Sequence, residues 1–153
     1  MLPRDDRIPS RNVTDSITIS TDPSRFDLDV IHGYLARSYW AAGIPRETVE
    51  RSIAGSLCFG AFDGDRQTGF ARVVTDRATF AYLADVFVLE EFRGRGVATR
   101  LMQAIVAHPE LQNLRRWLLV TRDAHPLYEK FGFRPLEKPD RHMEKVLSNA
   151  YRG

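Results

Sequence analysis

A chain of 153 residues is long enough to bury a hydrophobic core as one domain without disulfides or bound metal ions. Its formal net charge of only +2, with lysine and arginine spread along the chain, argues against a nucleic-acid partner. The single cysteine, Cys58, excludes an internal disulfide, and its place in an apolar run favours a small buried side chain over a nucleophile. Because no apolar run approaches the ~20 residues of a membrane span and no signal peptide is visible, we expect no membrane partner and a cytoplasmic location.

The first elements are predicted to be a strand and two helices. Apolar and hydroxyl residues alternate over residues 17–20, as in a short strand. Apolar residues then recur at helical spacing, which predicts a helix from about Asp27 to residues 38–42. Pro45 suits the first turn of a second helix, which Gly55 ends.

The rest of the chain alternates between strand and helix patterns. We predict strands over residues 56–62 and 67–75, joined by a tight turn at Asp63-Gly64, and then a long buried strand over 79–89. After these we predict a helix over 97–107, a strand over 116–121, a short helix over 126–130 and a final strand near 143–147. These elements predict one mixed α/β (α+β) domain over residues 16–153, because no linker is long enough to divide it. Residues 1–15 mix charges with prolines and show no period, which predicts a flexible tail.

Two glycines lie where the long strand gives way to the helix. Gly94 and Gly96 have no Cβ and let a ligand approach the backbone closely. The first amides of a helix have no acceptor within it and carry the positive end of its dipole. Arg93 and Arg95 add full positive charge at the same place. The segment therefore predicts a site for an anion such as a pyrophosphate.

Other phosphate-binding motifs fit this segment less well. A nucleotide P-loop requires Gly-Lys followed by Ser or Thr, which is absent here. A dinucleotide fingerprint places a third glycine where Thr99 stands, and an acidic residue about 20 positions later. The remaining alternative is a tight surface turn with solvated arginines.

Two motifs resemble those of the Gcn5-related N-acetyltransferases. Residues 93–98 (RGRGVA) match that family's Q/R-x-x-G-x-G/A signature, and residues 124–133 (AHPLYEKFGF) look like its A-x-x-L-Y-x-x-x-G-F segment. The resemblance covers residues 17–147, with both motifs in the expected order and separation. It implies a mixed central sheet of about six to seven strands, with splayed fourth and fifth strands and about four flanking helices.

The resemblance also implies acetyl-CoA as the cofactor. In that family the main chain of the splayed strand pairs with the pantetheine arm of coenzyme A, and the matching residues here are Val86, Phe87 and Val88. The residues that correspond to the pyrophosphate loop are Arg93, Gly94, Arg95, Gly96, Val97, Ala98 and the adjacent Thr99. Thr121 stands where many relatives carry an asparagine that contacts the cofactor, and a hydroxyl replaces only one of the hydrogen bonds of that amide.

The implied reaction is attack of a neutral amine on the acetyl thioester, with coenzyme A leaving as thiolate. Tyr128 aligns with the tyrosine that protonates the departing sulfur in many relatives; the alternative is a tyrosine that only packs under the cofactor. Asp85, an acid inside an apolar strand, is a candidate base, although a backbone or arginine partner would explain it equally well. His125 and Asp123 are further candidates, and His125 alternatively caps the short helix after it. Some relatives use only a chain of water molecules.

The acceptor pocket in this architecture is built from the first two helices and neighbouring strands. Tyr34, Tyr39, Trp40 and Tyr82 are therefore candidate substrate-binding residues, whose rings can stack on an acceptor or attract a cation. The alternative for Tyr34 and Trp40 is ordinary core packing. The size of the chain favours a small-molecule amine over a protein as partner, and a homodimer is left open.

Two other functions remain open. A module that binds acyl-CoA for sensing, without transfer, would have the same fold, and the presence of Tyr128 counts against it. A nucleic-acid-binding accessory protein would use Arg115, Arg116 and Arg122, but the chain lacks an interleaved aromatic and basic patch.

Overall fold

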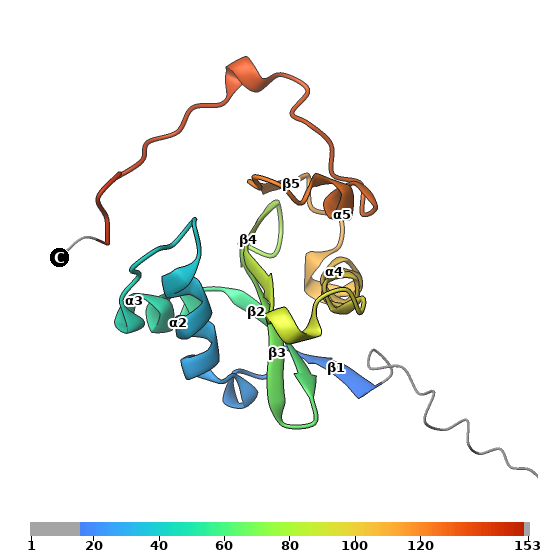
Figure 1. Ribbon diagram of the computed structural model, residues 1–153. Helices are drawn as coiled ribbons and strands as arrows, with labels where there is room; N and C mark the ends of the chain where they lie inside the picture. Colours follow the sequence, from blue (N-terminus) through green and yellow to red (C-terminus); the bar gives the residue numbers. More distant parts are fainter. Residues whose placement is uncertain (1–15, 152–153) are drawn as a thin grey trace, which may run out of the picture.

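A computed structural model describes residues 16–151 and shows a five-stranded sheet with helices on both faces (Figure 1). The strands lie side by side in chain order and are β1 (Ile17–Ser20), β2 (Leu57–Asp63), β3 (Arg66–Thr75), β4 (Phe80–Val88) and β5 (Arg116–Leu119). The first four pair antiparallel, and β4 pairs with β5 in parallel. The predicted tail over residues 1–15 lies outside the described residues. Within residues 16–151, no helix is long and apolar enough to cross a membrane.

In the described part of the chain, four α-helices cover the two faces of the sheet: α2 (Leu28–Arg37), α3 (Arg46–Ala54), α4 (Val97–Ala107) and α5 (His125–Glu129). Short 3-10 turns lie at Pro23–Arg25, Glu90–Phe92, Pro109–Leu111 and Pro139–Arg141. Helix α4 buries Leu101 and Ile105 in the larger core cluster. Helices α2 and α3 bury Ile31, Leu35 and Val49 on the opposite face. The two faces are thus closed by separate apolar clusters, and the strands between them carry the site.

The sheet opens between β4 and β5. Their parallel pairing runs from Phe80 and Arg116 to Leu83 and Leu119, where β5 ends, while β4 continues to Val88. Asp85 lies in this continuation with a left-handed φ of 56°, and the β3–β4 register shifts beside it. Such an irregularity bends a strand and redirects its side chains. The last residues of β4 therefore have β3 on one side and no strand on the other.

The sheet formed by residues 16–151 has five strands, so the expectation of six to seven is wrong. The strand predicted near residues 143–147 does not form; these residues have no regular secondary structure. A strand needs an edge to pair with, and after the turn at Pro139–Arg141 the chain runs away from β5 (Figure 1). Residues 134–151 instead form an extended segment, here called the C-terminal arm.

Candidate active site

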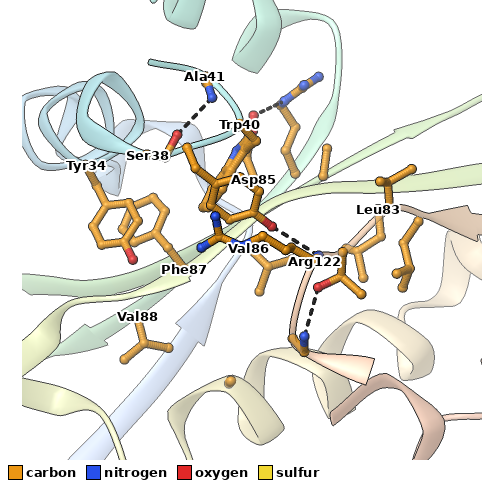
Figure 2. Close-up of a pocket in the computed structure, with 18 of the residues that line it drawn as sticks. Tyr34, Ser38, Trp40, Ala41, Leu83, Asp85, Val86, Phe87, Val88 and Arg122 are labelled. Atoms are coloured by element: carbon orange, nitrogen blue, oxygen red, sulfur yellow. Dashed lines mark hydrogen bonds and ion pairs between the residues drawn. The ribbon is translucent and has the colours of Figure 1, made fainter. Parts of the chain in front are cut away.

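A cavity of about 1200 Å³ lies where β4 separates from β5 (Figure 2). Its wall comes from α2 and the loop after it, from β4, from the loop before α4 and from the chain after β5. The sequence-predicted residues among those that line it are Tyr34, Tyr39, Trp40, Tyr82, Asp85, Val86, Phe87, Val88, Arg93, Ala98, Thr121, Asp123 and Tyr128. One cavity therefore brings together residues proposed for cofactor, acceptor and proton transfer.

Residues 86–88 of β4 form one wall of the cavity, and their side chains alternate between the two faces of the sheet. Phe87 is buried and stacks on Tyr34, with ring centroids 4.1 Å apart and an interplanar angle of 8°. Val86 and Val88 pack on the other face, against the cluster that contains α4. Because the side chains are anchored on both faces, the main chain is held rigid along its unpaired edge. Such an edge can accept an extended, amide-containing ligand as an added strand.

The loop between β4 and α4 has the geometry of an anion site. Gly94 and Gly96 both have left-handed φ angles, of 77° and 79°, which side chains with a Cβ rarely adopt. Gly96 is the N-cap of α4, and no side chain in the described part of the chain caps this helix start. The first amides of α4 are thus available to a ligand at the positive end of the helix dipole. Residues 94–98 fit a pyrophosphate on these grounds.

The arginines of this loop are oriented differently. Arg93 lines the cavity, and its guanidinium donates hydrogen bonds to the Tyr34 hydroxyl at 2.6 Å and to the Val88 carbonyl at 3.2 Å. Arg95 lies over the Phe92 ring, with 5.7 Å between the guanidinium carbon and the ring centroid. Arg93 thus connects the phosphate loop with the aromatic wall of the cavity.

Tyr128 lies on α5 with only 8% of its surface exposed. No described residue hydrogen bonds to its hydroxyl. Desolvation by burial, followed by the charges of Tyr39 and Asp123, raises the pKa of Tyr128 to about 12. The phenol is therefore neutral at physiological pH, and its O–H is free to donate to a ligand in the cavity.

Asp85 has two protein partners. Trp40 Nε1 donates to one carboxylate oxygen at 2.9 Å, and Arg72 Nε donates to the other at 2.8 Å (Figure 2). The Arg72–Asp85 ion pair is largely buried, with 19% and 10% of the side chains exposed. Asp85 therefore has the arginine partner that would explain a carboxylate inside an apolar strand without a catalytic role. The carboxylate retains lone pairs beyond these two bonds, so a ligand amine can still bind to it.

His125 does not lie with Tyr128 and Asp85 in this cavity. It is exposed, and it lines a second groove along β5, whose wall also includes Tyr128. It is not a helix cap either, because Ala124 is the N-cap of α5. The Thr121 hydroxyl accepts a hydrogen bond from the Ala124 backbone N–H at 3.0 Å, so this threonine is partly engaged in holding the start of α5.

Aromatic residues after α2 form part of the cavity wall. Tyr39 and Trp40 pack edge to face, with ring centroids 5.1 Å apart. The Arg122 guanidinium lies over the Tyr39 ring at 3.8 Å, and the Arg122 backbone N–H donates to the Tyr39 hydroxyl at 3.2 Å. This contact joins the loop after α2 to the chain that follows β5, and both residues line the cavity.

Sequence reasoning missed Arg72 and gave Arg122 a different purpose. Arg72 lies within β3 between two buried residues, and it pairs with Ala84 in the β3–β4 ladder. A charge inside an apolar strand is the signal that singled out Asp85, and the same signal at Arg72 would have predicted their pairing. Arg122 was considered only as a nucleic-acid ligand, whereas its ring contact places it at the cavity.

Known proteins resemble this chain in sequence and in fold. The acetyltransferase (GNAT) domain pattern matches residues 54–135, which include β4, the glycine loop and Tyr128. The chain belongs to the GNAT acetyltransferase family. The predicted resemblance is therefore confirmed, and the fold is the α+β fold of that family, with the five strands described above.

Relatives of this GNAT protein include candidate acetyltransferases from a fungus and a bacterium. A protein from Gibberella zeae (strain ATCC MYA-4620 / CBS 123657 / FGSC 9075 / NRRL 31084 / PH-1) is 30% identical over 135 residues, covering 73% of this chain and 75% of that protein. The crystal structure of a GNAT family member from Xanthomonas campestris pv. campestris is 50% identical, with a TM-score of 0.87, covering 90% of this chain and 97% of that one.

A more distant structural neighbour contains acetyl-CoA. GNAT acetyltransferases use acetyl-CoA, and a predicted acetyltransferase from Clostridium acetobutylicum was crystallised with acetyl-CoA. It shares the fold with this chain at a TM-score of 0.61 and 16% identity, over 84% of this chain and 99% of that one.

Proposed function

We propose that this GNAT protein transfers an acetyl group from acetyl-CoA to a primary amine of a small molecule. The observation that carries the proposal is the separation of β4 from β5 after Leu83 and Leu119. It leaves a rigid, unpaired stretch of main chain that leads from the buried phenol of Tyr128 to the uncapped start of α4. A long ligand with amides in its middle and a pyrophosphate at one end matches this sequence of features.

The residues that would hold acetyl-CoA are divided between β4 and the following loop. The main chain of residues 86–88 would pair with the pantetheine amides, and the amides of residues 94–99 with Arg93 and Arg95 would bind the pyrophosphate. Thr121 lines the cavity on the opposite side and can offer one hydroxyl contact. When bound, acetyl-CoA supplies an acetyl thioester, which a neutral amine can attack.

Two side chains of the cavity suit the proton transfers. The amine must lose a proton as the C–N bond forms, and Asp85 lies in the cavity with lone pairs to accept it. Tyr128 would donate its O–H to the sulfur as the C–S bond breaks. Since its pKa of about 12 exceeds the ~8.5 of an ordinary thiol, a shared hydrogen bond is favoured over complete proton transfer. His125, which lines the second groove, is the weaker candidate for either task.

The acceptor would bind between the aromatic wall and Asp85. Tyr34, Tyr39, Trp40 and Tyr82 supply faces on which an amine or its carbon skeleton can pack. The cavity also has to hold the thioester end of the cofactor, so about 1200 Å³ leaves room for a small acceptor. The contact between Tyr39 and Arg122 ties two segments of the cavity wall together, which favours a small molecule over a protein side chain on a folded surface.

The experiment is acetyl-CoA turnover followed by thiol release against a panel of polyamines, amino acids and aminoglycosides. The proposal predicts release with at least one amine, and a matching acetylated product by mass spectrometry. Acetyl-CoA binding without release for any amine in the panel would favour the sensing module that shares this fold. A product acetylated on oxygen would overturn the assignment to amines.

A further inference from the structure

Among the residues that the structure describes, four arginines line the cavity: Arg37, Arg72, Arg93 and Arg122. Arg72 is held in the ion pair with Asp85 at 2.8 Å. Arg93 donates to a hydroxyl and to a carbonyl, at 2.6 Å and 3.2 Å. Arg37 donates to a carbonyl of its own helix at 2.6 Å. These three guanidinium groups are committed to protein partners, which leaves Arg122 as the arginine best able to bind a ligand.

The Arg122 guanidinium keeps its hydrogen-bond donors unused. It lies over the Tyr39 ring at 3.8 Å, and no group in residues 16–151 accepts a hydrogen bond from it. Its nearest carboxylate is that of the adjacent Asp123, at 3.8 Å, and 63% and 69% of the two side chains are exposed. An exposed pair at this distance contributes little. Because a guanidinium presents its donors as a planar fork, Arg122 can bind a ligand carboxylate with two parallel hydrogen bonds.

Two aromatic rings connect Arg122 with Asp85 along the cavity wall. The Asp85 carboxylate accepts a hydrogen bond from Trp40 Nε1 at 2.9 Å, and the Trp40 ring packs against Tyr39 with centroids 5.1 Å apart. Tyr39 in turn contacts the Arg122 guanidinium and accepts a hydrogen bond from the Arg122 backbone N–H (Figure 2). One wall therefore holds an acceptor for an amine and a donor for a carboxylate.

The carboxylates of the cavity offer little to an acceptor with several positive charges. Four described carboxylates line it: Asp85, Glu90, Glu91 and Asp123. Asp85 and Asp123 each face an arginine. Glu90 and Glu91 belong to the turn before the glycine loop, and an arginine of β3 already bonds to Glu91. A polyamine or an aminoglycoside would therefore find no row of unpaired carboxylates beside the aromatic wall.

We propose that the acceptor is an α-amino acid with an apolar side chain, whose carboxylate binds to Arg122 while its amine lies beside Asp85. This inference rests on the proposed acetyl transfer and narrows its acceptor. Trp40 and Val120 line the cavity with 41% and 82% of their surfaces exposed, so they offer an apolar side chain a surface to cover. The amine nitrogen bonds to the acetyl carbon as the C–S bond breaks. The amine loses one proton and the sulfur gains one, which gives an N-acetylated amino acid and free coenzyme A.

The first test measures binding without turnover. L-phenylalanine, L-leucine and their amides are titrated by calorimetry into the full chain saturated with coenzyme A, at a mildly acidic pH that keeps every amine protonated. An acid should bind about 10-fold more tightly than its amide, the value of a charge-assisted hydrogen bond. Arg122→Gln should bind both forms as weakly as the wild type binds the amide. The control Arg115→Gln, which changes an exposed arginine of the second groove, should keep the preference. Equal binding of acid and amide by the wild type would overturn the inference.

The second test follows thiol release from acetyl-CoA with the same acids and amides, compared at equal concentrations of neutral amine. The wild type should prefer the acid in kcat/KM by about 10-fold, and Arg122→Gln should lose this preference while its kcat/KM for the amide stays unchanged. Arg122→Lys, which keeps the charge, should restore part of it. A merely structural role for Arg122 would lower both values equally and would overturn the inference.

The two tests separate this inference from the proposed function on which it rests. Thiol release with polyamines or aminoglycosides but with none of the amino acids would overturn the choice of acceptor and leave acetyl transfer to an amine in place. No thiol release with any amine, or no binding of coenzyme A, would overturn both.

Discussion

Leu83 of β4 and Leu119 of β5 form the last pair of the parallel ladder, and the cavity of this GNAT protein begins directly beyond them. Two residues after Leu83, Asp85 adopts a left-handed φ that is unusual for a side chain with a Cβ. Trp40 and Arg72 hold its carboxylate there. Backbone strain of this kind persists only when surrounding contacts enforce it, and it is common at functional sites. The end of one ladder and two side-chain bonds therefore shape the site.

Tyr128→Phe is expected to lower kcat for acetyl transfer about 100-fold, because it removes the group that stabilises charge on the departing sulfur. The hydroxyl has no partner among the described residues, so its loss should leave the free energy of unfolding unchanged or raise it by about 1 kcal/mol. Thiol-release kinetics and urea denaturation of the same samples measure the two quantities. Equal kcat values for variant and wild type would exclude a role for this phenol in the chemistry.

The same residue predicts how stability depends on pH. Burial raises the pKa of Tyr128 from 10.0 to about 12, so only the unfolded chain ionises this group between those values. Its contribution to stability is complete below pH 10 and is lost as the pH rises through 12. Relative to Tyr128→Phe, the wild type should lose about 2–3 kcal/mol over this range. Parallel urea titrations at pH 9, 10 and 11 test this: about half of the loss, ~1.4 kcal/mol, should be present at pH 11. A difference in unfolding free energy between wild type and variant that stays constant with pH would contradict it.

Arg93→Ala is expected to weaken acetyl-CoA binding about 10-fold, the cost of one charge-assisted hydrogen bond to a phosphate. The control is Arg77→Ala, which removes an exposed arginine that pairs with Glu110 at 2.6 Å and does not line the cavity. Titration calorimetry at two salt concentrations measures both. The wild-type affinity should fall more steeply with salt than that of Arg93→Ala. Equal losses in the two variants would argue against a specific phosphate contact.

Asp85→Asn keeps an acceptor for the Trp40 indole but removes the charge opposite Arg72. We expect a loss of about 1–2 kcal/mol in the free energy of unfolding and a drop of about 100-fold in kcat. The matched variant His125→Ala should retain near wild-type kcat, because His125 lies outside the cavity. The pH profile of kcat distinguishes a general base from a positioning group. If Asp85 is the base, the Asp85→Asn variant should lose the fall in kcat at acidic pH. If Asp85 only positions another group, the variant should keep that fall. A larger loss in His125→Ala would reverse the assignment.

Cys58 should not react with a thiol reagent at pH 8 while the chain is folded. The side chain is 4% exposed, and desolvation raises the thiol pKa to about 12, so almost no thiolate is present. Rapid reaction is expected only after unfolding in urea. This property also keeps the protein's own thiol out of the release assay. Fast labelling of the native chain would show that Cys58 becomes exposed.

Local signals account for the elements that were predicted well. Asp27 accepts hydrogen bonds from the backbone N–H groups of Asp29 and Val30, which fixes the start of α2. Gly96 begins α4 and His108 ends it, so the predicted range 97–107 is confirmed. Gly55 ends α3 as expected, whereas Pro45 is its N-cap rather than a residue of its first turn.

What depends on distant residues could not be predicted in the same way. The partner of Asp85 is Arg72, 13 positions earlier, and only the register of β3 on β4 brings them together. The groove that His125 lines follows from how α5 packs. The prediction of a strand over 143–147 is wrong because, after the turn at Pro139–Arg141, the chain runs away from the open edge of β5 and does not pair with it (Figure 1). Tertiary context decides each of these outcomes.

The most direct test of the proposed site is hydrogen–deuterium exchange of the full chain with and without acetyl-CoA. The account predicts slower amide exchange in two stretches, the free edge of β4 at residues 86–88 and the start of α4 at residues 94–99, with little change at the turn of residues 139–141. Protection that misses both stretches, or no protection at saturating acetyl-CoA, would contradict the placement of the cofactor between β4 and β5.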